Sequence, residues 1–374
     1  MLGFRKNHFK MPMGFLGILF VLLLAICGGI EKDVVSIAQR TLTPGILYSA
    51  IPYKAEKHWM EKQWGMFFPF YDYVRVNEES EQYAQDEATY QMILAMQAYD
   101  EDTKEEKEEI QTKEVAVKEV SIEKLKDFDY LLSHFYTVDS TTYVDETLLN
   151  ASEMLKKNMT IKGKEKGPKV LIFHTHSQEE FKNSKKGDAS TTIVGMGKFL
   201  SEKLNAKGIE TIHHAGVYDL IDGKLDRSKA YQLAEENVKK ILKENPTIEV
   251  VIDLHRDGVP EKKHLVTEID GKKTAKIMFF NGLSRTRANG EISYLRNPYI
   301  KDNLAFSFQM QLAAKKMYPG LTRNIYLKGY RYSLHMKPKS LLIEAGAQNN
   351  SVAEIKNAME CLSNVLCEVL QKTD

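Results

Sequence analysis

The sequence predicts an α/β fold in which helices flank a single, mostly parallel sheet. A membrane-spanning helix and a partly helical linker precede this fold. Two observations lead to the expectation. From Lys169 onward, short apolar runs alternate with amphipathic helical patterns, as in strands joined by crossover helices. Near the N-terminus, residues 13–30 form an uncharged apolar run that is long enough to cross a bilayer.

The first thirty residues predict a single membrane anchor. Residues 1–12 carry Arg5, Lys6 and Lys10, and basic residues before a span favour a cytoplasmic tail. We therefore expect residues 13–30 to cross the cell membrane once and the rest of the chain to lie outside the cytoplasm. A cleaved signal peptide is the alternative, and Cys27 also permits a lipoprotein interpretation. The poor match to small residues around Ala25 favours an uncleaved anchor.

Residues 31–120 are predicted to be a membrane-proximal region followed by a charged linker. The part around residues 48–73 is rich in aromatic side chains, and residues 100–119 mix acidic and basic groups with few large apolar ones. The whole chain has 52 basic and 51 acidic residues, so its net charge gives no reason to expect nucleic-acid binding.

The main domain is predicted to cover residues 121–374, with a helical lead-in over 121–160 and a core from about residue 168. A turn at 162–168 separates the two parts. Periodicity and Gly or Pro stop signals then place the elements in order. Strands are expected at 169–173, 209–212, 248–252, 275–280, 323–327 and 340–343, and helices at 192–204, 228–244, 303–318 and 352–370.

Three of these predicted strands lead directly into residues that can bind a metal ion or polarise water. The first runs into His174, His176 and Glu179, the second into Asp253, His255 and Asp257, and the third into Glu344. Ligands of open α/β sheets gather beyond the carboxyl ends of the strands. Two imidazole-bearing strand ends and a carboxylate therefore predict a zinc site with one position left open for water.

Each candidate also has a structural interpretation. His174 and His176 are two apart in chain expected to be extended, so both should face one ion, but they could instead cap the following helix. Asp253 or Asp257 could orient His255, or both could form an ion-pair cluster with Arg256. Glu344 is a candidate general base, or a partner of Arg331 or Lys328. Substrate contacts are expected from the side chains Arg331, His335 and Asn281.

The chain resembles the stage II sporulation protein P family of endospore-forming Firmicutes. The resemblance rests on VLIFHTHSQEEF, VVIDLHRDGV, AKIMFFNGL, YPGLTRNIYLKGYRYSLHM and LLIEAGAQNN, and it is continuous from about Asp127 to Leu370. It implies a fold like that of zinc amidases and a zinc-dependent N-acetylmuramoyl-L-alanine amidase, with possible endopeptidase action on cross-links. The expected setting is septal wall thinning and engulfment, with peptidoglycan as substrate and stage II sporulation proteins D and M as partners.

Carried over by motif, the resemblance implies zinc ligands at His176, Glu179 and His255, and a catalytic glutamate at Glu344. Two histidines stand where the general amidase pattern has one, so His174 is kept as the alternative ligand. A different class of function also fits the sequence. The chain could be a metal-holding peptidoglycan-binding scaffold that recruits a partner hydrolase.

Overall fold

The computed structural model describes residues 122–162, 165–287 and 290–371. The predicted tail, anchor and linker over residues 1–120 lie outside these residues. Within the described part of the chain, no helix is both long and apolar enough to cross a membrane.

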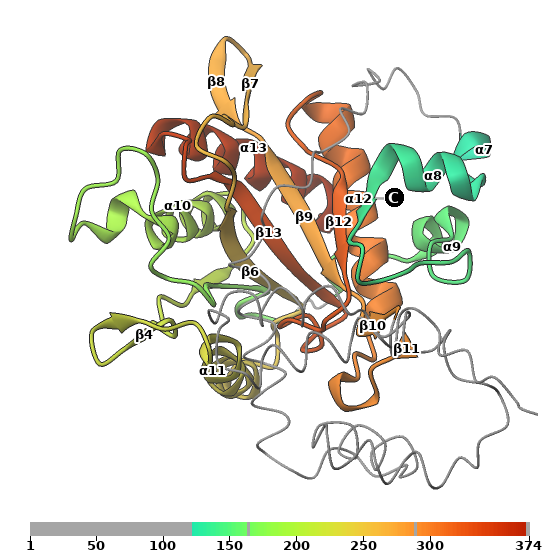
Figure 1. Cartoon of the computed structure of the whole chain (residues 1–374), viewed down its shortest axis with the longest axis horizontal. Coiled ribbons are helices and arrows are strands. Elements are labelled where there is room, and N and C mark those ends of the chain that lie inside the picture. The colour runs from blue at the N-terminus through green and yellow to red at the C-terminus, as the bar shows by residue number, and fades with distance from the viewer. Residues whose placement is uncertain (1–121, 163–164, 288–289, 372–374) are drawn as a thin grey trace, which may run out of the picture. The chain divides into compact units, whose positions relative to one another are not determined.

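A mixed sheet of seven strands forms the centre of the described residues, in the order β1-β12-β9-β13-β6-β2-β3 (Figure 1). Five of its six strand pairs are parallel, and β13 with β9 is antiparallel. The predicted mostly parallel sheet is therefore confirmed. One consequence matters for the site: β2, β3, β6 and β13 run one way, and β1, β9 and β12 run the other. The strands are β1 (Tyr136–Val138), β2 (Val170–Phe173), β3 (Thr211–His213), β6 (Val250–Asp257), β9 (Ile277–Gly282), β12 (Ile325–Lys328) and β13 (Lys339–Ala347).

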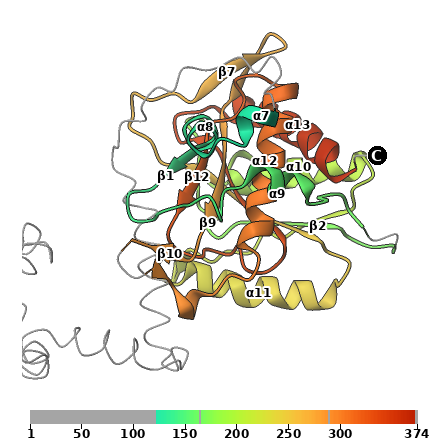
Figure 2. The same cartoon turned by 90° about the vertical axis from the view of Figure 1, so that its right-hand side faces the viewer.

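Helices cover both faces of this sheet (Figure 2). One face packs against α10 (Ile193–Ala206), α12 (Ile300–Met317) and α13 (Val352–Leu370), and the other against α11 (Ala230–Glu244). The predicted helical lead-in appears as α7 (Ile122–Leu125), α8 (Phe128–Phe135) and α9 (Ala151–Lys156). Its Phe135 joins the α12 side of the core.

Alternation along the strands divides the buried side chains between the two faces. On β6, Val250, Ile252 and Leu254 belong to the large core beneath α10, α12 and α13, whereas Val251 packs with the side chains of α11. By the same period of two, Asp253 and His255 lie on the α11 face. The sheet therefore buries apolar side chains on both faces, and the polar side chains of β6 lie on the α11 face.

The structure also contains short hairpins and 3-10 helices that were not predicted from the sequence. Three hairpins are formed by β4 (Leu220–Ile221) with β5 (Lys224–Leu225), β7 (Val266–Ile269) with β8 (Lys272–Ala275), and β10 (Arg285–Thr286) with β11 (Gly290–Glu291). Two 3-10 helices, η1 (Ala189–Thr191) and η2 (Ser293–Leu295), complete the elements. The turns of the first two hairpins place Asp222 and Asp270 at positive φ, a conformation that Asp tolerates better than most residues.

Candidate metal site

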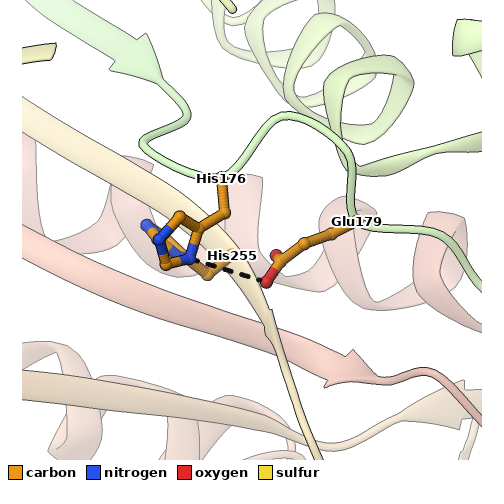
Figure 3. Close-up of side chains that lie close together, drawn as sticks. All are labelled: His176, Glu179 and His255. Atoms are coloured by element: carbon orange, nitrogen blue, oxygen red, sulfur yellow. Dashed lines mark ion pairs between the residues drawn. The ribbon is translucent and has the colours of Figure 1, made fainter. Parts of the chain in front are cut away.

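Three buried side chains converge beyond β2 and beside the end of β6 (Figure 3). His176 and Glu179 come from the loop that follows β2, and His255 comes from β6. One potential ligand atom from each lies within 4.8 Å of the others. The sequence predicted these three residues as metal ligands, and the structure brings them together. The rings of His176 and His255 meet edge to face, with centroids 5.0 Å apart.

The donor set fits zinc. Tetrahedral zinc with bonds of about 2.0–2.2 Å needs ligand atoms roughly 3.4 Å apart, so the three side chains are within a small rotation of that geometry. Two imidazoles and one carboxylate are also the ligands of known catalytic zinc sites, in which a fourth position remains open. Burial below 4% for all three residues excludes competing water from most of the cluster.

The carboxylate of Glu179 is held by a backbone N–H group and by a nearby positive charge. Its Oε2 accepts a hydrogen bond from the backbone N–H of Arg256 at 2.7 Å, and its Oε1 lies 3.6 Å from Arg227 Nη2 and 3.9 Å from His176 Nδ1. Burial raises the pKa of Glu179 to about 7, and the charge of Glu344 acts in the same direction. A bound cation would favour the ionised carboxylate.

Of the two aspartates that the sequence offers as partners of His255, Asp253 is the one that lies beside it. His255 Nε2 lies 2.8 Å from Asp253 Oδ1, so the carboxylate is close enough to orient the imidazole. The same Asp253 accepts hydrogen bonds from the backbone N–H and the hydroxyl of Thr175. Asp253 therefore fixes both the loop after β2 and the β6 ligand. Asp257 instead pairs with Arg323, whose Nη1 is 2.6 Å from Asp257 Oδ2.

Glu344 lies next to this cluster. It sits inside β13, directly in register with His255 on β6, so the two side chains share the α11 face of the sheet. Glu344 is 3% exposed, and its charge contributes to the raised pKa of Glu179. This places a second carboxylate beside the three potential ligands.

His174 has a different environment from His176, so the expectation that both face one ion is wrong. β2 ends at Phe173, and the chain leaves the extended conformation that the expectation assumed. His174 Nδ1 lies 2.7 Å from the carbonyl oxygen of Leu254, and its Nε2 lies 3.0 Å from His213 Nε2. Burial lowers the pKa of His174 to about 3, and His174 is not one of the three side chains whose ligand atoms come together.

The structure divides the three predicted substrate contacts between the two faces of the sheet. Arg331 Nη2 and His335 Nε2 lie 3.0 and 3.1 Å from the carboxylate of Glu235 on α11. Asn281 follows Phe280 on β9, and its register partner Leu327 belongs to the core beneath α12. Asn281 is therefore on the opposite face of the sheet from Glu344. It is also near the carboxyl end of β9, which points away from that of β13.

Several residues around the cluster were not predicted to have a role. The ring of Tyr231 on α11 packs edge to face against His176, with centroids 5.6 Å apart, and in turn contacts Tyr332. Asp219 accepts hydrogen bonds from the residues between His176 and Glu179. Tyr231 falls within the predicted helix 228–244, and no spacing pattern distinguished it or Asp219 as a site residue.

A buried His-Glu-His cluster at the edge of an α/β sheet is the kind of site that defines metal-binding hydrolytic proteins. Residues 55–367 match the family described as Stage II sporulation protein P (SpoIIP), and the chain belongs to that family. It is 25% identical over 217 residues to stage II sporulation protein P of Bacillus subtilis (strain 168), covering 54% of this chain. The chain matches only about half the length of that relative, 50% of it.

The described fold is also similar to solved structures. The CwlD amidase of Clostridioides difficile, solved in complex with the GerS lipoprotein, has a TM-score of 0.36 at 16% identity. That comparison covers 54% of this chain and 98% of the other. The catalytic domain of CwlV, an N-acetylmuramoyl-L-alanine amidase from Bacillus (Paenibacillus) polymyxa var. colistinus, has a TM-score of 0.32 at 12% identity, covering 54% and 97%.

Proposed function

We propose that this chain is a zinc-dependent peptidoglycan hydrolase of sporulation that cuts the amide between N-acetylmuramic acid and L-alanine. The observation that carries the proposal is the convergence of His176, Glu179 and His255, with ligand atoms within 4.8 Å, beside the carboxylate of Glu344. Membership in the stage II sporulation protein P family supports the sporulation setting. The resemblance to the amidase motifs supports the amide as the bond that is cut.

His176, Glu179 and His255 would hold the zinc ion. When bound, zinc lowers the pKa of a coordinated water and polarises a substrate carbonyl. The chain's own residues supply the remaining chemistry. Asp253 orients His255, and the backbone N–H of Arg256 orients Glu179, so the ligand set is largely formed before a metal or substrate arrives.

Glu344 is assigned the general-base role. It would take a proton from the attacking water and return it to the amide nitrogen of the departing L-alanine, so that one carboxylate serves both half-reactions. Its position in β13 supports this role, because a strand holds the side chain more rigidly than a loop would. The ring of Tyr231 packs against His176 on the α11 side of the cluster.

The proposal is tested with the purified full-length chain on isolated sacculi, with and without a chelator. Free stem peptides should appear only when zinc is present, and mass analysis of the products separates amide cleavage from cross-link cleavage by the new N-terminus. Cleavage at cross-links alone would contradict the amidase assignment. Zinc-independent release of stem peptides would contradict the metal mechanism.

The first specific prediction concerns Glu344→Gln. We expect this variant to retain equimolar zinc and to lose about 10²- to 10⁴-fold in cleavage rate, the usual contribution of a general base. Glu202→Gln on the exposed face of α10 is the matched control and should cleave normally. If Glu344→Gln and the parent chain both bind sacculi and neither cleaves them, the scaffold function replaces the hydrolase.

We also propose that residues 13–30 anchor the chain in the cell membrane, with the main domain outside the cytoplasm, and that stage II sporulation proteins D and M are its partners. The basic tail and the uncharged apolar run support the anchor. Protease added to intact protoplasts should then degrade the main domain. Co-purification from sporulating cells with each partner tests the assembly.

A further inference from the structure

Two buried carboxylates hold the loop that carries two of the three potential metal ligands. Asp253 accepts from the backbone N–H and hydroxyl of Thr175, at 2.9 and 2.6 Å. Asp219 accepts from the hydroxyl of Ser177 at 2.7 Å and from the backbone N–H of Gln178 at 3.1 Å. His176 lies between these two attachments in the sequence, and Glu179 follows the second. Residues 174–179 belong to no helix or strand; a turn at residues 177–178 and a hydrogen bond from the Ile193 N–H to the Glu179 carbonyl, at 3.0 Å, also hold the loop.

Asp219 is itself fixed by the fold. Its side chain is fully buried, and the preceding residue, Tyr218, packs in the core between the sheet and α11. The backbone carbonyl of Asp219 accepts a hydrogen bond from the N–H of Asp226 at 2.9 Å, which closes the base of the β4–β5 hairpin. The Asp219 carboxylate is therefore attached to backbone that is fixed at the base of a short hairpin.

Burying a carboxylate is costly unless hydrogen bonds compensate for the lost water. The donors that Asp219 receives come from the ligand loop, so its burial and the loop conformation depend on each other. The chain that leaves the hairpin also contacts the cluster, because Arg227 Nη2 lies 3.6 Å from Glu179 Oε1. Segment 219–227 thus contacts the ligand loop at both of its ends.

We propose that Asp219 is a positioning residue for the metal site: by holding Ser177 and Gln178 it fixes the loop conformation in which His176 and Glu179 face His255. The link to metal binding rests on the proposed function, whereas the effect on the loop does not. Residues that orient metal ligands typically contribute about 10- to 100-fold to metal affinity. We assign Asp219 a contribution of that size.

The test compares Asp219→Asn with Asp222→Asn in the full-length chain. Both variants lose one negative charge from the same hairpin, but Asp222 is exposed at the turn. In asparagine only one of the two terminal atoms can accept, so the contact with Gln178 or Ser177 is either lost or, at the Ser177 hydroxyl, reversed in direction, and neither contact keeps a charged acceptor. Zinc affinity is measured by competition with a chromophoric chelator, and loop order by hydrogen exchange of segment 175–179 in the metal-free chain. Thermal unfolding of the metal-free chain is measured in parallel.

We expect Asp219→Asn to lose exchange protection in segment 175–179 and to bind zinc about 10- to 100-fold more weakly, with Asp222→Asn unchanged. A merely structural role would lower the unfolding temperature and leave zinc affinity intact, which would overturn the proposal. Unchanged exchange in the loop would also overturn it. If the parent chain binds no zinc, the proposed function fails and, with it, the metal part of this inference; the exchange measurement still decides whether Asp219 fixes the loop.

Ser177→Ala is a second variant in case Asp219→Asn does not fold. It removes one of the two hydrogen bonds and leaves the carboxylate held by Gln178. Zinc affinity should fall by at least about threefold, the equivalent of a weak hydrogen bond. The double variant should lose less than the product of the two single effects, because both substitutions break the same contact. Fully multiplicative effects, or unchanged affinity in Ser177→Ala, would count against Asp219 acting through this contact.

Discussion

His174 and His176 show how local chain direction decides the role of a side chain. The sequence HTHSQE contains enough chemistry to predict a metal site, but not which histidine takes part. The answer depends on where β2 ends, and an apolar run does not define its last residue to within two positions. Because the chain turns after Phe173, His176 meets Tyr231 and His255, while His174 meets His213 and the Leu254 carbonyl.

Glutamine substitutions at these two positions should have opposite consequences. His176→Gln removes a ligand and should abolish equimolar zinc binding at micromolar metal. His174→Gln should keep zinc binding but lose about 1–3 kcal/mol of the free energy of unfolding, because a buried hydrogen-bonded group is replaced by one of different shape. Zinc titration and urea unfolding of the metal-free chains provide the two measurements. If His174→Gln lost zinc binding while its stability was unchanged, His174 and not His176 would be the zinc ligand.

At the scale of elements, the strands that build the site are predicted from the sequence, but two of them are longer in the structure than predicted. The predicted strands 248–252 and 340–343 are extended in the structure to Asp257 and Ala347. Asp253, His255 and Glu344 are therefore strand residues and do not follow strand ends. The apolar pattern stops where polar site residues begin, yet hydrogen bonds between β6 and β13 continue through them. Periodicity detects burial by apolar side chains, and here the buried side chains are polar.

Helix α10 approaches the sheet at Gly197, which leads to a prediction about packing. An added Cβ there would lie 2.4 Å from His174 Nε2 and 2.9 Å from His213 Nε2. Alanine gains about 1 kcal/mol over glycine from helix propensity, but overpacking typically costs about 1–3 kcal/mol. The His174 ring is fixed by contacts at both nitrogens, so we expect the overpacking cost to dominate and Gly197→Ala to be net destabilising.

Urea unfolding of Gly197→Ala and Gly258→Ala tests this balance. Nothing lies within 4 Å of a Cβ added at Gly258, so that variant should change stability by no more than about 0.5 kcal/mol. A Gly197→Ala chain as stable as the parent would show that the two imidazoles can move aside. The site would then be less rigid on its α10 side than the hydrogen bonds of His174 indicate.

At the scale of the whole domain, the direction of each strand decides which predicted residues meet. β2, β6 and β13 are parallel, so the polar residues in the later parts of β6 and β13 lie beside those that follow β2. β9 and β12 run the opposite way, so Asn281 and the residues after β12 start from the other edge of the sheet. No single sequence pattern reveals this reversal, because short buried strands look alike whichever way they run. The predicted ligands and base converge on the α11 face, where Arg331 and His335 also lie, whereas Asn281 is on the opposite face.

The segment that follows β12 returns across the α11 face and is tied there by Glu235. The Glu235 carboxylate lies 3.0 Å from Arg331 Nη2 and 3.1 Å from His335 Nε2, and it is almost fully buried. Burial alone would raise the pKa of Glu235, but the hydrogen bond and charge of His335, with the charge of Arg331, lower it well below 4.5. Glu235 thus joins the α11 layer to the connection between β12 and β13.

The carboxylate of Glu235 binds a proton less tightly in the folded chain than in the unfolded chain. Protonation of Glu235 in acid therefore lowers the free energy of unfolding. Its stabilisation is present above about pH 4.5 and is lost as the pH falls below that value. We expect Glu235→Gln to lose roughly 3–5 kcal/mol near neutral pH, since it leaves a buried guanidinium without its carboxylate. The difference from the parent should shrink steadily in urea titrations carried out at successively lower pH. Glu236→Gln, the exposed neighbour on α11, should match the parent throughout. A Glu235→Gln difference that stays constant or widens in acid would show that the layers are held together by packing and not by this ion pair.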